Sequence, residues 1–412
     1  MNKYAKLTSW IVVLLLALAA IPSAEAAFVI GGENGWQFST DGFVNVFGVY
    51  QVREKVPAGP RTGGEIGGPG FSTGNETQQQ FSVRTGLLPT CFGFNIKAPT
   101  TDGVDYAVRL GIYPQIQNAA TGGSSNTRTD INPNVDFREV NFTAEGSFGQ
   151  VLAGRALNLF MGKNILTDMT LFSAGTVGPV NNGPTMGHIG YGYLYPNFGA
   201  QIRYTTPSMG GVKVAVSVND PYNISTASNR NIPRFESEVS YASKFNDMTM
   251  QGWIGGLYQT ARFSDTAGGG SITQYGGTFG ASVGVKGLDL LLSGYGGQAL
   301  GGLGVDGDVD SKNHPRQDWG FLAQATYKLT PTLKIGANYG QTNTIETAQD
   351  TIDRIAGTNS NIKTKQCAVG TLTYNVNKFT QLIAEYSWAQ DKWHDGNTQD
   401  SNTIALGTFF YW

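Results

Sequence analysis

The residues with the clearest chemical potential in this chain are arginines that fall on the polar faces of alternating segments. Arg84, Arg109 and Arg203 occupy such positions, and Asp168 is the most suitable acid in a long connecting loop, with Lys163 beside it. Fixed cations that face a fixed anion across water create a transverse field, which orients polar solutes and filters them by charge. These residues therefore predict selection among dissolved solutes. The alternative for each arginine is an ion-paired strut inside a wall, and for Asp168 a solvated loop residue.

Residue types for catalysis or metal binding are sparse. The three histidines, His188, His314 and His394, all fall in predicted loops, and no two have metal-ligand spacing. The acidic run that begins at Asp306 resembles the start of a calcium loop, but Ser311 replaces the glycine that such a loop requires. The chain has no serine-nucleophile elbow and no phosphate-cradling loop. The sequence therefore predicts a protein that is not an enzyme and that needs no cofactor or metal.

The elements that must position these side chains are β-strands. Most of the chain consists of segments of about 9–12 residues in which polar and apolar residues alternate, the length that a tilted strand needs to cross a bilayer. In Val212–Asn219, four valines share one face, and lysine, alanine, serine and asparagine share the other. Short turns alternate with long polar loops, as on the two rims of a membrane barrel. The segments run from Trp36–Val52 to Asn402–Trp412, and the second, Gln79–Ala98, has a predicted bulge near Leu88.

The predicted fold class is all-β: a transmembrane antiparallel β-barrel of 16 strands, in which residues 27–412 form a single domain. The formal net charge of -2 does not indicate the basic surface that nucleic-acid binding requires. Two cysteines are too few for a disulfide framework, and we expect Cys91 and Cys367 to be separate wall residues. The same alternation would also fit a soluble sandwich, whose polar faces would meet water. Charges on the polar faces and the signals at both ends of the chain favour the barrel.

Both ends of the chain carry export signals. A positive amino-terminal region, a short apolar run and an A-x-A cleavage site predict that residues 1–26 are a signal peptide, which is removed. The chain stops on an aromatic residue without a polar tail, and aromatic residues anchor strand ends at a membrane interface. Gly407, Phe410 and Trp412 also resemble the carboxy-terminal assembly signal of Gram-negative outer-membrane proteins. That resemblance implies recognition by the barrel-assembly machinery.

One connection breaks the pattern of ordinary loops. Residues 156–196 separate the fifth and sixth predicted strands, and this stretch of about 40 residues is more apolar than the other loops. An apolar loop at the mouth of a barrel should bury itself, and the available place is the lumen. There it would narrow an otherwise wide water channel. We therefore predict that this long third loop folds into the lumen.

At this point the chain resembles the general trimeric porins of Gram-negative bacteria. The most specific match is FGQVLAGR, residues 148–155, which is similar to the turn and fifth strand before the inward-folded loop of that family. By this resemblance Arg155 belongs to a basic cluster on the wall. The segment Phe81–Gly86 is similar to the strand that supplies another wall arginine, here Arg84. The loop departs from the enterobacterial pattern, because its P-E-F-G-G motif is absent.

These expectations define a water-filled outer-membrane channel for passive diffusion of small hydrophilic solutes and ions. The resemblance implies a homotrimer, and the expected surroundings are outer-membrane lipid and lipopolysaccharide. One alternative is a channel specific for a sugar, a carboxylate or another anion; another is a barrel hydrolase, which would need a histidine near a nucleophile on a strand end. The predicted pore constriction consists of Arg84, Arg109, Arg155, Arg203, Lys163 and Asp168.

Overall fold

The computed structural model describes residues 28–66, 77–117, 135–178, 183–224, 228–229, 232–263 and 270–412. The predicted signal peptide, residues 1–26, lies outside these ranges. The described part is mostly β-strand, with two short helices, α2 (Gly162–Thr167) and α3 (Ala348–Ile355), and one 3-10 turn, η1 (Met169–Phe172). No helix in the described ranges is long and apolar enough to cross a membrane.

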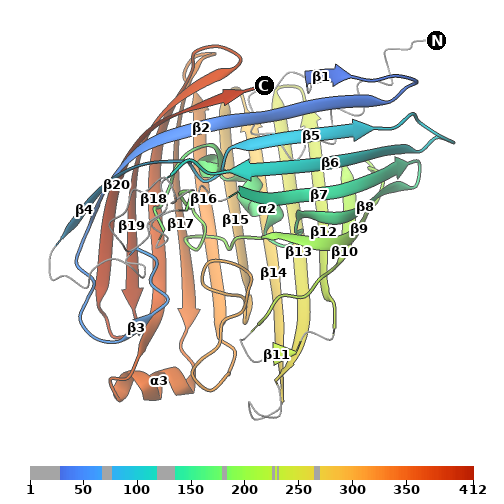
Figure 1. The fold of residues 1–412 in the computed structure, drawn as a ribbon. Helices are drawn as coiled ribbons and strands as arrows, with labels where there is room; N and C mark the ends of the chain where they lie inside the picture. The colour runs from blue at the N-terminus through green and yellow to red at the C-terminus, as the bar shows by residue number, and fades with distance from the viewer. Residues whose placement is uncertain are drawn as a thin grey trace, which may run out of the picture.

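Within the described ranges, sixteen antiparallel wall strands close into a barrel (Figure 1). The last strand, β20 (Thr398–Tyr411), pairs with the first wall strand, β2 (Gln37–Arg53), and this pairing closes the ring. β4 and β5 both pair with β2, one after the other, so together they occupy one position in the wall. The predicted all-β barrel is confirmed.

The other wall strands follow in chain order. They are β4 (Gln78–Arg84), β5 (Cys91–Lys97), β6 (Asp105–Pro114), β7 (Val135–Gly146), β8 (Gly149–Leu157), β9 (Phe198–Thr205), β10 (Val212–Asn219), β12 (Arg234–Phe245), β13 (Met248–Phe263), β14 (Ser271–Val285), β15 (Leu288–Gln298), β16 (Gln317–Lys328), β17 (Leu333–Ile345), β18 (Ser360–Asn375) and β19 (Thr380–Trp393). Three short strands are additions to this ring, namely β1 (Phe28–Gly31), β3 (Arg61–Thr62) and β11 (Ser228–Asn229).

Alternation along each strand separates an apolar outer face from the lumen. In β20, Ile404, Leu406 and Phe410 are more than half exposed, whereas Phe409 and Tyr411 are buried on the inner face. An exposed apolar band of this kind would be unfavourable in water, but it matches the hydrocarbon core of a bilayer. The inner aromatic residues instead pack against one another, and Phe409 and Tyr411 are stacked with ring centroids 5.5 Å apart.

The second predicted strand is interrupted rather than bulged. In place of a continuous Gln79–Ala98, β4 and β5 are separated by residues 85–90. The Leu87 amide in this break donates a hydrogen bond to the carbonyl oxygen of Ser173, which belongs to the loop inside the barrel (2.9 Å). The interruption therefore gives that loop a point of attachment to the wall.

The connection between β8 and β9 folds into the barrel, as predicted. We call residues 158–197 the inner loop; it carries α2 and η1, and Figure 1 shows α2 inside the ring of strands. Phe160, Met161 and Leu194 of this loop are completely buried. α3 lies at the end of the barrel opposite the end of β20, and it therefore marks the rim that carries the long loops (Figure 1).

Candidate functional site

A buried ion pair on β12 holds the first residues of the inner loop. The side chains of Arg234 and Glu236 are fully buried, and Arg234 Nη2 lies 2.6 Å from Glu236 Oε1. The other carboxylate oxygen of Glu236 accepts hydrogen bonds from the amides of Leu159 and Phe160, at 2.8 and 3.0 Å. The ion pair therefore fixes the first residues of the inner loop to the wall.

The rest of the inner loop lies against strands β14 to β19. Asn164 of α2 accepts a hydrogen bond from a threonine hydroxyl of β14 at 2.8 Å. Asp168 accepts one from Asn338 Nδ2 of β17 at 3.1 Å. Further along, the amide of Gly175 donates to Glu385 Oε1 of β19 at 2.5 Å. These bonds hold one face of the loop on that half of the wall and leave the other face free.

Glycines in the wall make this close packing possible. A β-carbon at Gly340 of β17 would lie 2.1 Å from the carbonyl oxygen of Tyr191 in the inner loop. At Gly336 it would lie 2.7 Å from the sulfur of Met169. Any side chain at these positions would push the loop toward the centre of the barrel. The sequence of the wall therefore fixes on which side the loop docks.

The free face of α2 looks toward strands β9 to β12. Lys163, Leu166 and Thr167 are the partly exposed residues of this helix, and their spacing places them on one face. Lys163 Nζ lies 3.7 Å from Glu238 Oε1 of β12. Arg203 of β9 is partly exposed and lies within electrostatic reach of the same carboxylate. This arrangement brings together two of the six predicted site residues, Lys163 and Arg203, with one acid that the sequence analysis did not select.

Arg109 takes the position of a strut across the wall. Its guanidinium contacts Asp41 of β2 at 2.9 Å and Glu139 of β7 at 2.8 Å, so it joins strands on both sides of β6. A β-carbon at Gly93 would lie 2.4 Å from Asp41 and 2.9 Å from the Arg109 guanidinium, which shows that this glycine provides space for the ion pair. The charge of Arg109 is therefore compensated within the wall.

Asp168 and Arg84 are both deeply buried. Asp168 has no exposed surface, and besides its bond to Asn338 it accepts a hydrogen bond from Tyr193 Oη at 2.7 Å. Arg84 lies on the inner face of β4, where it is paired in register with Phe47, and it is 1% exposed. Neither group borders open space at the free face of α2.

Arg155 marks the point where β8 leaves β7. The last rung of that ladder pairs Val140 with Arg155, whereas β8 continues to pair with β9 as far as Leu157. Arg155 is exposed, and it pairs in register with Val140 and Ala200. Both of these residues are also exposed, so all three lie on the outer face of the wall. This parity differs from the lumen parity that the resemblance implied.

One histidine differs from the expectation for a loop residue, whereas the two cysteines are separate wall residues as expected. His188 is not a solvated loop residue: it is fully buried in the inner loop, with Nε2 2.8 Å from Asn338 Oδ1. Cys91 of β5 and Cys367 of β18 are buried free thiols. Both groups therefore pack inside the barrel.

A second connection also folds inward, which the sequence analysis did not predict. We call residues 299–316 the cap loop. The amide of Tyr195 in the inner loop donates to the carbonyl oxygen of Leu303 at 2.7 Å, and Arg234 Nη1 donates to the carbonyl oxygen of Val305 at 3.0 Å. The buried pair on β12 thus holds both loops. The inward fold of this loop could have been inferred from one feature of the sequence. An otherwise polar connection contains three large apolar residues, Leu300, Leu303 and Val305.

The loop between β2 and β4 adds an acid to this region. Glu65 Oε1 lies 3.7 Å from Lys365 Nζ of β18, and the amides of Glu65 and Ile66 donate to Asp391 Oδ2 at 2.5 and 2.9 Å. Burial raises the pKa of Glu65 to about 7, although Lys365 acts in the opposite direction. Glu65 is therefore a lumenal carboxylate that changes charge near neutral pH.

Channel selectivity is expected to depend on pH through this residue. Above a pH of about 7 Glu65 is ionised, and below it the group is neutral, so the lumen loses one negative charge on acidification. We expect the cation-to-anion permeability ratio, from reversal potentials in planar bilayers, to fall between about pH 8 and about pH 6. Glu65→Gln should abolish this step, and Asp395→Asn, in an exposed loop, should leave it in place. An unchanged step in Glu65→Gln would assign it to another group.

The comparisons with known proteins agree with this architecture. The sequence matches the family model of Gram-negative porins over residues 12–407, and the chain therefore belongs to that family. It is an outer-membrane porin, and the predicted family, location and channel function are confirmed. A search of curated proteins found no significant match.

Solved structures share the fold at low sequence identity. The outer-membrane channel DcaP of Acinetobacter baumannii has a TM-score of 0.67 at 14% identity, with 93% of this chain and 100% of that chain covered. An anion-selective porin from Comamonas acidovorans has a TM-score of 0.61 at 16% identity, covering 92% and 100%. The trimer form of OmpT of Vibrio cholerae has a TM-score of 0.52 at 11% identity, also covering 92% and 100%. At these identities the likeness shows the fold alone.

Proposed function

We propose that this porin is a general diffusion channel whose narrowest part lies between α2 and strands β9 to β12. The observation that carries the proposal is the approach of Lys163 to Glu238 at 3.7 Å, with Arg203 on the same stretch of wall. Two cations and one carboxylate border this passage, so its net field is weak and positive. Solutes would be sorted first by size and then by charge, with a slight preference for anions.

The other predicted constriction residues take supporting roles in this proposal. Arg109, held between Asp41 and Glu139, stiffens the wall that faces α2. Asp168 anchors the inner loop to β17, and Arg84 supports the buried inner face of β4. The exception is Arg155, which lies where the β8–β9 pair leaves β7 and is exposed on the outer face, so the proposal does not include it in the constriction.

Removing single charges tests the constriction. Lys163→Gln and Arg203→Gln should each raise the cation-to-anion permeability ratio about twofold, and Glu238→Gln should lower it by a similar factor, because a unit charge a few Å from a permeating ion interacts with about 1 kcal/mol in water, less after screening. Reversal potentials in a salt gradient measure the ratio. Lys312→Gln, on the exposed rim, is the matched control. Unchanged ratios in both Lys163→Gln and Arg203→Gln would contradict the proposed constriction.

Solute size tests the general-diffusion part of the proposal. Liposome swelling with sugars and amino acids of graded size should give rates that fall smoothly with size. Rates that saturate for one class of solute would instead support a channel specific for that class.

The mature assembly is proposed to be a homotrimer without catalytic activity. Support comes from the exposed apolar outer face around Tyr50, Phe81 and Leu406, and from the likeness to a porin solved in a trimer form. We propose that residues 1–26 are removed, that the terminal strand is recognised by the barrel-assembly machinery, and that the outer wall meets lipid and lipopolysaccharide. Cross-linking in outer membranes would show a three-chain species; a purely monomeric product would contradict the trimer.

A further inference from the structure

The cap loop is fixed within the barrel along its inner stretch. Leu300 and Val305 are completely buried, and Lys365 Nζ of β18 donates to the carbonyl oxygen of Gly302. On the opposite side of the barrel, Arg234 of β12 donates to the carbonyl oxygen of Val305 at 3.0 Å. The loop thus lies in the lumen between β12 and β18, whose long side chains reach it, and it contacts the inner loop at Tyr195.

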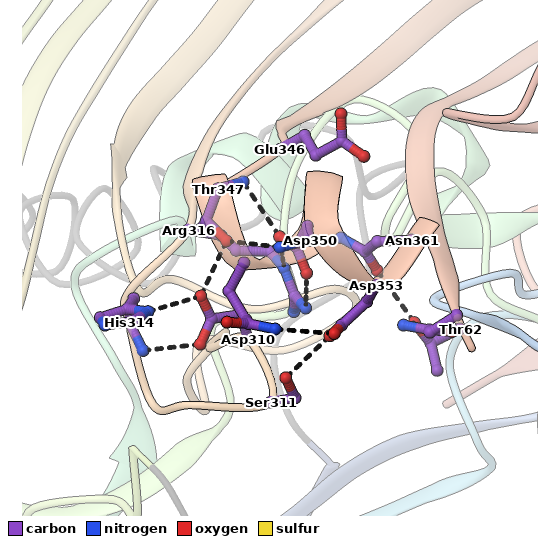
Figure 2. A network of polar contacts seen from close by, with 12 residues as sticks. Thr62, Asp310, Ser311, His314, Arg316, Glu346, Thr347, Asp350, Asp353 and Asn361 are labelled. Atoms are coloured by element: carbon purple, nitrogen blue, oxygen red, sulfur yellow. Dashed lines mark hydrogen bonds and ion pairs between the residues drawn. The ribbon is translucent and has the colours of Figure 1, made fainter. Parts of the chain in front are cut away.

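A network of charged groups fixes the other end of the cap loop to α3 (Figure 2). Arg316 donates two hydrogen bonds to the carboxylate of Asp350, both at 2.8 Å, and a third to Asp308. Thr347 Oγ1, at the start of α3, donates to Asp310 Oδ2 at 2.7 Å. Burial opposes the ionisation of Asp350, but the bonds from Arg316 and Thr347 outweigh it and lower the pKa of the carboxyl group. The Asp350 carboxylate that Arg316 holds is therefore ionised at neutral pH.

Between these two anchors the cap loop presents one exposed carboxylate, Asp306. The backbone around it is held in a tight form: a β-carbon at Gly301 would lie 2.0 Å from the carbonyl oxygen of Gly304, and Gly301 has a φ of 137°. Asp306 is exposed, and its electrostatic neighbours are Lys365 of β18 and Arg234 of β12. Since these residues belong to opposite walls, the carboxylate lies in the interior of the barrel rather than on its outer rim.

We infer that the cap loop forms a second charge filter, in series with the passage at α2, and that Asp306 is its selectivity-determining residue. The inference rests on the proposed diffusion function. A solute that arrives from the long-loop rim meets this carboxylate first and the cations Lys163 and Arg203 afterwards. The upper filter favours small cations and cationic amino compounds, and the lower passage favours anions. Two opposed filters in series would favour zwitterionic solutes over solutes that carry a net charge of either sign.

Asp306 can be tested by changing its charge, because its side chain is exposed. Asp306→Asn should lower the cation-to-anion permeability ratio two- to threefold, and Asp306→Lys should lower it further. Asp353→Asn is the matched control: it also removes one carboxylate charge near the cap loop, but Asp353 belongs to α3, where it accepts a hydrogen bond from Ser311 Oγ at 2.7 Å (Figure 2). That variant should leave the ratio unchanged.

The outcomes separate this inference from the proposed constriction. If Lys163→Gln shifts the ratio and Asp306→Asn does not, the second filter is rejected and the constriction stands. An equal shift in Asp306→Asn and Asp353→Asn would reduce Asp306 to a general rim charge and would also reject it. A wild-type protein that inserts but does not conduct would reject both proposals. The filter is supported if Asp306→Asn lowers the permeability ratio, Asp306→Lys lowers it further, and Asp353→Asn leaves it unchanged.

Discussion

Glu236→Gln is expected to destabilise the barrel by about 3–5 kcal/mol, because the change leaves the guanidinium of Arg234 buried without its counter-ion. Both side chains are completely buried, so water cannot replace the lost interaction. The same carboxylate holds the amides of Leu159 and Phe160, and Arg234 also holds the cap loop at Val305. The variant should therefore show a lower urea midpoint in detergent and a noisier, larger single-channel conductance, since both loops lose an anchor.

The chain offers a matched control two residues further along the same strand. Glu238→Gln makes the same chemical change on the same inner face of β12, but this carboxylate is partly exposed and contacts Lys163 at 3.7 Å. It should alter ion selectivity with little effect on the urea midpoint. A double replacement, Arg234→Met with Glu236→Leu, should recover much of the stability but not the quiet conductance. If Glu236→Gln matched Glu238→Gln in stability, the buried pair would not be the anchor.

The wall of this barrel could be predicted because the two faces of each strand contact two different solvents. Lipid on one side and a polar lumen on the other impose a period of two, and strands such as Val212–Asn219 carry that period without ambiguity. The interruption at residues 85–90 was only partly visible, as a change of parity near Leu88. Local sequence reported the change, but not that the break serves as a docking point for Ser173 of the inner loop.

The interior could not be predicted in the same way, because its contacts join residues far apart in sequence. Asp168 had the right type and position for a constriction acid, yet its partner Asn338 lies 170 residues away. The lumen position of Arg203 followed from strand parity, whereas that of Arg155 was taken from resemblance alone, and its register places it on the other face. The cap loop was read as an ordinary polar connection, since its buried residues are few and its anchors Arg234 and Lys365 lie on distant strands.

Gly407→Ala is expected to destabilise the barrel by about 1–3 kcal/mol through overpacking. Gly407 of β20 is paired with Phe47 of β2 at the seam where the barrel closes, and a β-carbon there would lie 2.1 Å from Cδ1 of the Phe47 ring. The ring is completely buried and packs edge-on against Phe409, with centroids 5.9 Å apart, so it has no room to move aside. Gly370→Ala, where no atom lies within 4 Å of the added carbon, is the control and should be neutral.

The same glycine also belongs to the predicted assembly signal, and a double-mutant cycle separates the two roles. Phe47→Ala alone should cost about 3–5 kcal/mol by leaving a cavity, but it also removes the ring that the added methyl group would strike. If the role of Gly407 is steric, Gly407→Ala causes no further loss of stability in the Phe47→Ala background, and the coupling energy equals the loss seen in the wild type. If the role is recognition, the yield of folded barrel in the outer membrane falls equally in both backgrounds, while the urea midpoint of the purified protein stays unchanged. A fall in yield without a shift in midpoint would therefore exclude the steric account, because a clash at the seam must lower the stability of every barrel that closes.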